Sequence, residues 1–464
     1  MDPEVKELLL GMHREYQLQG PSMKEAPAFY RNLEQTLDLR RSEGGLLTAK
    51  PRWADSVYDF TSSDFLSLNR SNRIRDAFLA ELAQTPDFRL SASGSRVQYG
   101  NYDYLNQVEQ EIASFYGSET AYIAHSGWLA NVGVLAAVPL PGDAIVYDEL
   151  VHASTHEGMK ISVASHRMPF LHNDPDSLRD VLSVLRDEHS AFQSGTRSVL
   201  ICVESVYSMD GDVCPLKEMV QVAKELFPLG NAQFIIDEAH STGTIGPKGA
   251  GLVAELGLEK DIAIRLHMSS KALGATGGVI LCAKPIRTMI LNHARFAIYS
   301  GAPSYPMVAC IRAGYQLMSS GQTQKHIQLA VRHFFKTITS HDMYEEATDR
   351  GIFTIPLAED WETRPFMTHI VAVRTKKPRY EQYLFFHLLL ANINAYATSY
   401  PTVPKGQHRV RVIFHAHNTI EQVDALVAAI CEWAREMVEI EDGESEHTLP
   451  GATRQVYALE GLAQ

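Results

Sequence analysis

The 464-residue sequence predicts an α/β protein, with a large, doubly wound and mostly parallel sheet followed by a smaller α+β domain. Between about residues 60 and 310, short apolar runs alternate with helical segments, which is typical of strands joined by crossover helices. After about residue 311 the alternation stops. The length also exceeds what one simple core supports, so we expect at least two lobes.

Apolar runs of four to six residues carry the strand predictions, because a parallel sheet buries such runs on both faces. They lie at residues 120–124, 144–147, 198–203, 233–236 and 278–282. Helical stretches separate them, as at residues 104–115 and 216–226. This pattern predicts a large domain over residues 59–310, preceded by an N-terminal arm at residues 1–58.

The smaller domain is predicted over residues 311–440. We expect a long helix at about 310–338, strands near 352–355, 369–374 and 409–414, and a last amphipathic helix at about 419–438. Residues 441–464 form an acidic tail that we expect to be loose at first.

The charge balance argues against nucleic acid as a partner. Lys and Arg total 42 against 55 Asp and Glu, a formal charge of −13, whereas phosphate affinity depends on clustered positive charge. The sequence at Asp237 to His240 spells the DEAH of helicases, but no glycine-rich loop ending in Lys-Ser/Thr accompanies it. His152 and His156 have helical metal-ligand spacing without an obvious third ligand, so we predict no metal site.

The compartment is expected to be the cytoplasm. Five scattered cysteines without CxxC spacing indicate reduced thiols. The start, Met-Asp-Pro-Glu, is acidic where a leader would be basic. The apolar run at residues 8–10 is too short to span a bilayer, and no later segment reaches that length.

Asp237 and Lys271 are the first candidates for chemistry. Asp237 ends an apolar strand, at the sheet edge where parallel sheets bind ligands. Lys271 comes 34 residues later among small residues, and the glycines at 274, 277 and 278 allow a bulky phosphate-bearing ligand to approach the backbone. Taken singly, such an Asp is usually a helix cap and such a Lys a solvated side chain.

Seven short motifs connect these residues to a known family. They are Gly94-Ser-Arg, Ser126-Gly-Trp, His152-Ala-Ser, Tyr207-Ser-Met-Asp-Gly-Asp, Asp237-Glu-Ala-His-Ser-Thr-Gly, Ser270-Lys-Ala-Leu-Gly and Pro401-Thr-Val-Pro. In this order, over about residues 59–440, the chain resembles the α-oxoamine synthases. These are fold-type I enzymes that use pyridoxal 5'-phosphate (PLP), so the resemblance implies a PLP Schiff base on Lys271.

The resemblance implies a role for each matching residue. Lys271 would also act as the base for the substrate Cα proton, and Asp237 would pair with the pyridine nitrogen. His240, helped by Ser208, would bind the ring oxygen, and His152 would stack on the ring and assist protonation. The segment Ser126-Gly127-Trp128, opening a helix, would hold the phosphate. Each of these residues also has a purely structural interpretation. His240 could be a satisfied core histidine, His152 the start of a helix, and Ser126-Gly127 an ordinary turn.

Departures from the family pattern concern the pockets. Met268 stands where a phosphate-binding Thr is usual, so Ser269 or Ser270 would take over, and Gly301 replaces a second such Thr, next to Ser300. Arg411 matches a carboxylate-binding arginine. Two further substrate-binding candidates occupy altered positions, namely Ser399 before the Pro-Thr-Val-Pro motif and Ser63 in place of an Asn.

The resemblance implies a homodimeric acyltransferase that condenses a small α-amino acid with an acyl thioester, carried by CoA or a carrier protein. Decarboxylation would then give an α-aminoketone. The altered pockets indicate a specialised member, of the kind found in secondary metabolism. Two alternatives stay open: a PLP-dependent aminotransferase, and a catalytically silent partner subunit, although such subunits typically lack the Schiff-base lysine.

Overall fold

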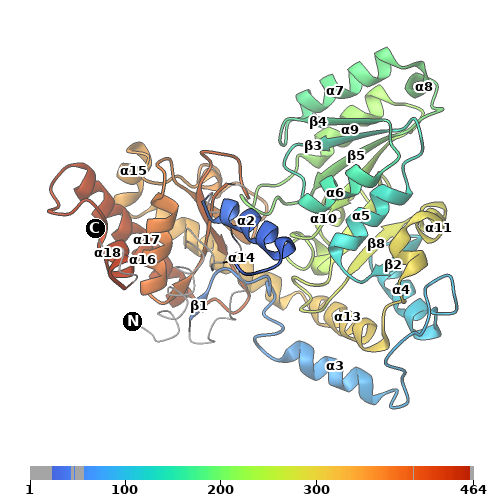
Figure 1. Cartoon of the computed structure of the whole chain (residues 1–464), viewed down its shortest axis with the longest axis horizontal. Coiled ribbons are helices and arrows are strands. Elements are labelled where there is room, and N and C mark those ends of the chain that lie inside the picture. The colour runs from blue at the N-terminus through green and yellow to red at the C-terminus, as the bar shows by residue number, and fades with distance from the viewer. Residues whose placement is uncertain (1–22, 43–45, 47–56, 401, 460–464) are drawn as a thin grey trace.

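The computed structural model describes residues 23–42, 46, 57–400 and 402–459 (Figure 1). The run at residues 8–10 and Pro401 of the Pro-Thr-Val-Pro motif lie outside these ranges. The described chain forms two lobes, with the first lobe carrying the larger sheet (Figure 1).

The large lobe is built on a seven-stranded sheet in the order β2-β8-β7-β6-β5-β3-β4. The strands are β2 (Thr120–Ala124), β3 (Ala144–Asp148), β4 (His166–Phe170), β5 (Val199–Glu204), β6 (Ala232–Asp237), β7 (Ile262–Met268) and β8 (Gly278–Cys282). β8 runs antiparallel to both of its neighbours, β2 and β7, and the other neighbouring pairs are parallel. The predicted mostly parallel α/β sheet is therefore confirmed.

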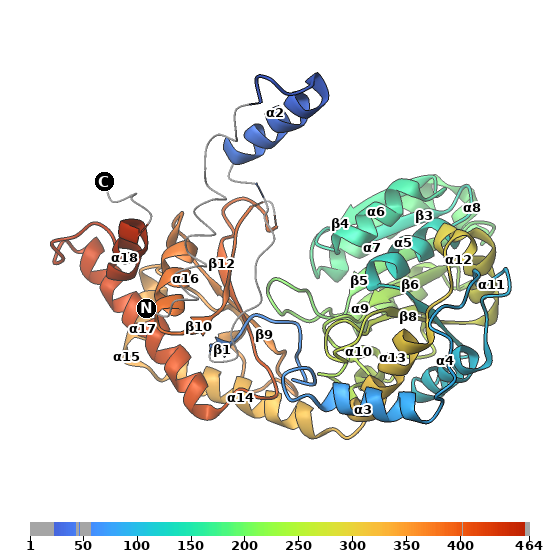
Figure 2. The ribbon, with the colours of Figure 1, turned by 60° about the horizontal axis from the view of Figure 1, so that its bottom comes forward.

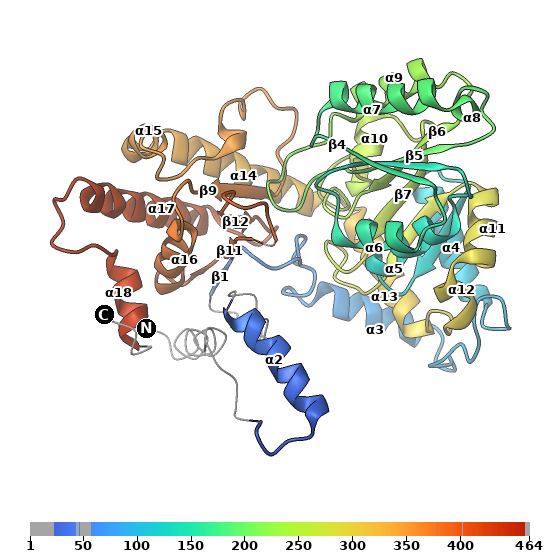
Figure 3. The same cartoon turned by 45° about the horizontal axis from the view of Figure 1, so that its top comes forward.

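Helices cover both faces of this sheet, as a doubly wound topology requires (Figure 3). One face packs α5 (Gly127–Ala137), α6 (Ala153–Ile161), α11 (Lys284–His293) and α12 (Arg295–Tyr299). The other packs α7 (Pro175–Glu188), α8 (Ser190–Gln193), α9 (Leu216–Leu226) and α10 (Leu252–Leu256). The carboxyl ends of the parallel strands stay open towards the second lobe, which is where such sheets bind ligands.

The small lobe has a three-stranded antiparallel sheet in the order β11-β12-β9. Its elements are β9 (Ile370–Arg374), β11 (Tyr396–Thr398), β12 (Arg409–Ile413), α14 (Gln322–Thr339), α15 (Asp342–Asp349), η2 (Pro356–Ala358), α16 (Tyr380–Leu390), α17 (Ile420–Glu441) and α18 (Gly451–Leu459). In the tail, α18 packs onto the core through Val456, which is fully buried.

Two expectations for this lobe are wrong. The helix expected at about 310–338 is two helices, α13 (Tyr305–Met318) and α14, because Gly321 adopts a left-handed φ of 72° between them. Residues 352–355 form no strand; only Thr354 bridges to Arg374 before η2 begins.

Residues 58–69 connect the two lobes. β1 (Tyr58–Asp59) pairs in parallel with β10 (Ile393–Asn394) of the small lobe, and Ala416 N donates to Phe65 O. Asn69 Nδ2 then donates to Gly274 O, in the loop that carries Lys271. A hydrophobic core shared by both lobes includes α3 (Arg73–Ala83), α4 (Asp103–Phe115) and α13. By contrast, α2 (Ala28–Ser42) buries none of its residues and stands apart from both lobes (Figure 2).

Candidate active site

Lys271 lies in the loop between β7 and β8, at the open edge of the large sheet. The loop closes through Ser269 N donating to Gly277 O and Gly274 N donating to Lys271 O. The Lys271 Nζ lies 2.8 Å from His240 Nε2. Burial lowers the pKa of Lys271, against the opposing charges of Asp237 and Glu204. A neutral amine is the nucleophilic form, so this lysine suits attack on an aldehyde.

Asp237 ends β6 and is buried beside this lysine. Its Oδ2 accepts a hydrogen bond from Asn131 Nδ2 at 2.8 Å, and its Oδ1 accepts one from Ala239 N at 2.9 Å. Both bonds fix the orientation of the carboxyl group. Asn131 stands on α5, so the helix after β2 holds the acid at the end of β6.

Glu204 is a buried second carboxyl group that the sequence reasoning missed. It ends β5 and pairs in register with Asp237. Burial first, and then the charge of Asp237, raise the pKa of Glu204 well above its usual value, while the backbone N–H of His152 donates to it. An acidic residue that closes an apolar strand, as Asp237 does, was the signal that could have identified it.

Two histidines flank the lysine. Burial lowers the pKa of His240 well below its usual value, and the charges of Lys271 and His369 add to this shift, so its imidazole is neutral. His152 is the N-cap of α6, with Nδ1 accepting from Ser154 N at 3.2 Å, and its ring lies edge-on to Trp128. Loss of hydration lowers the pKa of His152 as well. In this structure His152 therefore caps a helix and also lies at the mouth of the site.

The start of α5 forms a tight cradle. Ser126 caps the helix, its Oγ accepting from Leu129 N at 3.1 Å. A Cβ on Gly127 would lie 1.9 Å from Met268 Sδ, and one on Gly278 would lie 3.0 Å from Gly127 Cα. The absence of a side chain at Gly127 and Gly278 thus lets Met268 and β8 pack against a helix N-terminus, which is a favourable place for a phosphate.

Arg411 extends from β12 of the small lobe towards the same edge. Its Nη1 donates to Ser208 O at 3.2 Å, and its buried Nε has no partner in the described structure. The other candidates lie differently: Ser63, Ser270 and Ser399 are exposed, and Ser300 Oγ donates to Phe296 O within α12. The structure therefore brings Arg411 to the cluster of Lys271, but it gives none of these four serines a hydrogen bond to that cluster.

These groups fit PLP. The amine of Lys271 can bind its aldehyde, the hydrogen-bonded carboxyl group of Asp237 can pair with its ring nitrogen, and a helix N-terminus can take its phosphate. His240 Nδ1 and Arg411 Nε are buried polar atoms without partners in the described residues, which marks the same edge as a place for polar ligand groups.

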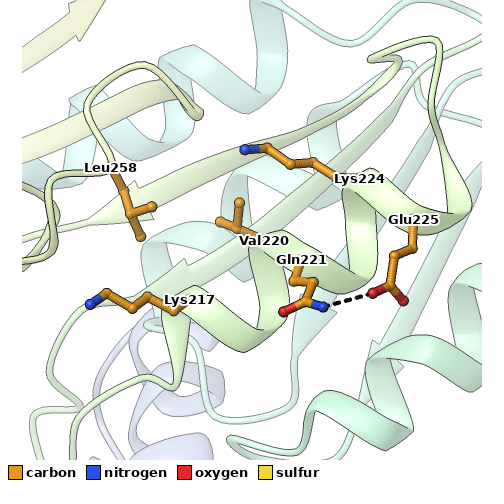
Figure 4. Close-up of a pocket in the computed structure, with 6 residues that line it drawn as sticks. All are labelled: Lys217, Val220, Gln221, Lys224, Glu225 and Leu258. Atoms are coloured by element: carbon orange, nitrogen blue, oxygen red, sulfur yellow. Dashed lines mark hydrogen bonds between the residues drawn. The ribbon is translucent and has the colours of Figure 1, made fainter.

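One groove of the large lobe lacks such chemistry. The groove drawn in Figure 4 is lined by α9 and Leu258, with Gln221 bonded to Glu225 and Lys224 paired with Asp261, and it holds none of the site residues. Within the described ranges, no three His, Cys, Asp or Glu side chains are grouped to hold a metal. Nor does any helix there have the length and apolar character needed to cross a membrane.

Comparisons with known proteins agree with this geometry. Residues 55–430 match the family described as aminotransferase class I and II. The aminoacyl transferase sphA of Aspergillus fumigatus is 52% identical over 445 residues, covering 95% of this chain and 94% of that protein. The 8-amino-7-oxononanoate synthase of Emericella nidulans is 40% identical over 413 residues, covering 86% and 95%. A serine palmitoyltransferase from S. paucimobilis, solved with PLP and myriocin, shares the fold at a TM-score of 0.70 and 22% identity, covering 90% of this chain and 99% of that one.

Proposed function

The chain belongs to the class I and II aminotransferase family and, within it, to the α-oxoamine synthases, and from that premise we propose that it is a PLP-dependent acyltransferase. It joins the Cα of a small α-amino acid to the acyl carbon of a thioester. One new C–C bond forms, the thiol leaves, the carboxylate departs as CO2, and an α-aminoketone remains. The observation that carries this proposal is the amine of Lys271, held 2.8 Å from His240 beside the buried Asp237.

The protein residues divide the work. Bound PLP withdraws electrons from the amino acid Cα and makes its C–H bond acidic. Lys271 attaches the cofactor and, when its amine is free, accepts the Cα proton. Asp237, oriented by the hydrogen bond from Asn131, would pair with the ring nitrogen. His240 and Ser208 bind the ring oxygen.

Substrate groups meet residues of both lobes. Arg411 offers its guanidinium to the amino-acid carboxylate, because a planar donor pair matches that group. His152 would lie against the cofactor and polarise the acyl carbonyl. Ser126, Gly127 and Trp128 would hold the phosphate, with the exposed Ser270 as a supporting donor, while Ser63 and Ser399 would lie at the substrate entrance.

The assembly we propose is a homodimer in the cytoplasm. Large apolar side chains are exposed on two segments joined by the hydrogen bond from Ala302 N to Gly94 O: Leu90, Tyr99 and Tyr299 are 73%, 101% and 75% exposed. A second copy would cover such a surface. The free thiols of the five cysteines agree with a reducing compartment.

The purified protein reconstituted with PLP tests the proposal. A panel of amino acids is added with and without acyl thioesters, and thiol release, CO2 and the visible spectrum of the cofactor are followed together. We expect thiol and CO2 in equal amounts, only when both substrates are present. The Lys271→Ala variant should lose this turnover and the covalently held cofactor.

Other results would assign the chain differently. Conversion of the cofactor to pyridoxamine with a keto acid as product, and no thiol, would establish an aminotransferase. A protein that binds no PLP would contradict the proposal and leave the silent partner subunit.

A further inference from the structure

The loop at residues 207–213 carries Ser208 and is fixed to the large lobe by a charged histidine. His172 Nε2 contacts Asp212 Oδ2 at 2.6 Å, and its Nδ1 contacts Asp148 Oδ1 at 2.9 Å. Burial opposes protonation, but the hydrogen bonds to the two carboxylates raise the pKa of His172 to about 10. The loop is therefore held on this side by a positive imidazole between two acids.

The small lobe contacts the same loop on its other side. Thr368 Oγ1 donates to Gly211 O at 2.6 Å. Gly211 has a φ of 74°, and a Cβ there would lie 2.0 Å from Ile370 O. Glycine is thus required where the loop packs against the start of β9. A displacement of the loop would therefore also displace the small-lobe sheet.

Asp210, in the middle of this loop, binds two arginines of the small lobe. Its carboxylate accepts from Arg409 Nη1 and, at 2.9 Å, from Arg374 Nε. The two arginines are register partners across β12 and β9, and Arg409 is only 1% exposed. Two neighbouring guanidinium groups repel each other, and Asp210 is the carboxylate that compensates them.

Arg411 lies two residues further along β12, and alternate residues of a strand share a face. Among the described residues it has no carboxylate within ion-pair distance, and its one hydrogen bond goes to a carbonyl, that of Ser208. We infer that Asp210 is a positioning residue: it engages Arg374 and Arg409, holds Ser208 against β12, and so leaves Arg411 as the guanidinium available to the substrate carboxylate. This inference rests on the proposed function, since it assigns the amino-acid carboxylate to Arg411.

The test measures the KM of the amino acid, kcat and the affinity for PLP in the holoenzyme. Asp210→Asn keeps the shape of the side chain but leaves Arg374 and Arg409 uncompensated, so the loop separates from β12. We expect the KM to rise about 10- to 100-fold, the range of one charge-assisted hydrogen bond, with kcat within about threefold of the parent. Asp424→Asn is the matched control, because Asp424 pairs with His333 between α17 and α14, and it should leave all three values unchanged.

The double variant Asp210→Asn/Arg409→Gln carries the test even if the single variant does not fold, because it removes the buried acid together with its most buried partner. Because it also lacks the ion pairs that hold the loop to β12, its KM should stay raised as in the single variant, with kcat and PLP affinity within about threefold of the parent. An unchanged KM in Asp210→Asn, or in the double variant, would overturn the inference. A parent protein without amino-acid-dependent thiol release would overturn the proposed function as well, which separates the two failures.

Discussion

Replacing Asn131 with Ala removes the amide that donates to Asp237 Oδ2 over 2.8 Å. Asn131 is 4% exposed and Asp237 7%, so water cannot easily take the place of the amide. A hydrogen bond to a charged group contributes about 1.5–3 kcal/mol, and Asp237 keeps only the bond from Ala239 N. We therefore expect PLP affinity to fall by about 10- to 150-fold, because a carboxylate that Asn131 no longer orients pairs less well with the ring nitrogen.

The assay is a titration of the cofactor-free protein with PLP, followed by visible absorbance. Asn131→Asp should be more severe than Asn131→Ala, because two carboxylates at hydrogen-bond distance cannot both be ionised. Asn292→Ala is the control, since Asn292 only donates to Thr288 O on the exposed face of α11. A PLP affinity of Asn131→Ala within about twofold of the parent would refute the reasoning, since it would mean that this hydrogen bond does not support Asp237.

Three further substitutions test other parts of the site. Glu204→Gln should keep near-parental turnover. In the parent, we expect the unfolding free energy to fall as pH rises above about 5, because the raised pKa of Glu204 makes the folded state bind an extra proton. Glu204→Gln should abolish this fall, which urea unfolding at pH 5 and 7.5 measures. His172→Gln should lower the unfolding free energy by about 2 kcal/mol at pH 7. This loss should disappear above pH 10, because His172 stabilises the fold only while its ring is protonated. If denaturation across this pH range showed that the loss persists above pH 10, the protonated ring would not be its cause. Gly127→Ala should reduce PLP affinity about tenfold, because the added methyl group displaces Met268. Combining it with Met268→Ala should restore the affinity. A double variant that binds PLP as weakly as Gly127→Ala alone would contradict the clash.

The strands that the sequence predicts well are those with uninterrupted apolar runs. Residues 120–124 and 278–282 were placed to the residue, because both faces of those strands are buried. β7 escaped prediction since Arg265 and His267 interrupt its pattern, yet both are buried, with Arg265 Nη2 donating to Tyr116 O. A long-range partner of that kind cannot be read from the local sequence.

The site shows the same limit. Motif spacing singled out Lys271, Asp237 and His240, which the fold brings together. Glu204 was missed because its meaning depends on which strand lies beside β5, a fact of sheet order rather than of sequence. Asp210 was predicted only as part of the Tyr207-Ser-Met-Asp-Gly-Asp motif, without a role of its own. Its two arginine partners come from strands about 160 and 200 residues away.

The strand pair β1–β10 has a consequence for how the chain acquires its shape. Tyr58 meets Ile393 across more than 300 residues, so the small lobe cannot be completed during synthesis until the last third of the chain has emerged. Closing so long a loop is entropically costly and slows folding. The segment at residues 58–69 therefore lacks its small-lobe partners while the large sheet assembles. Removing it should leave a small lobe that cannot be expressed as a separate folded unit.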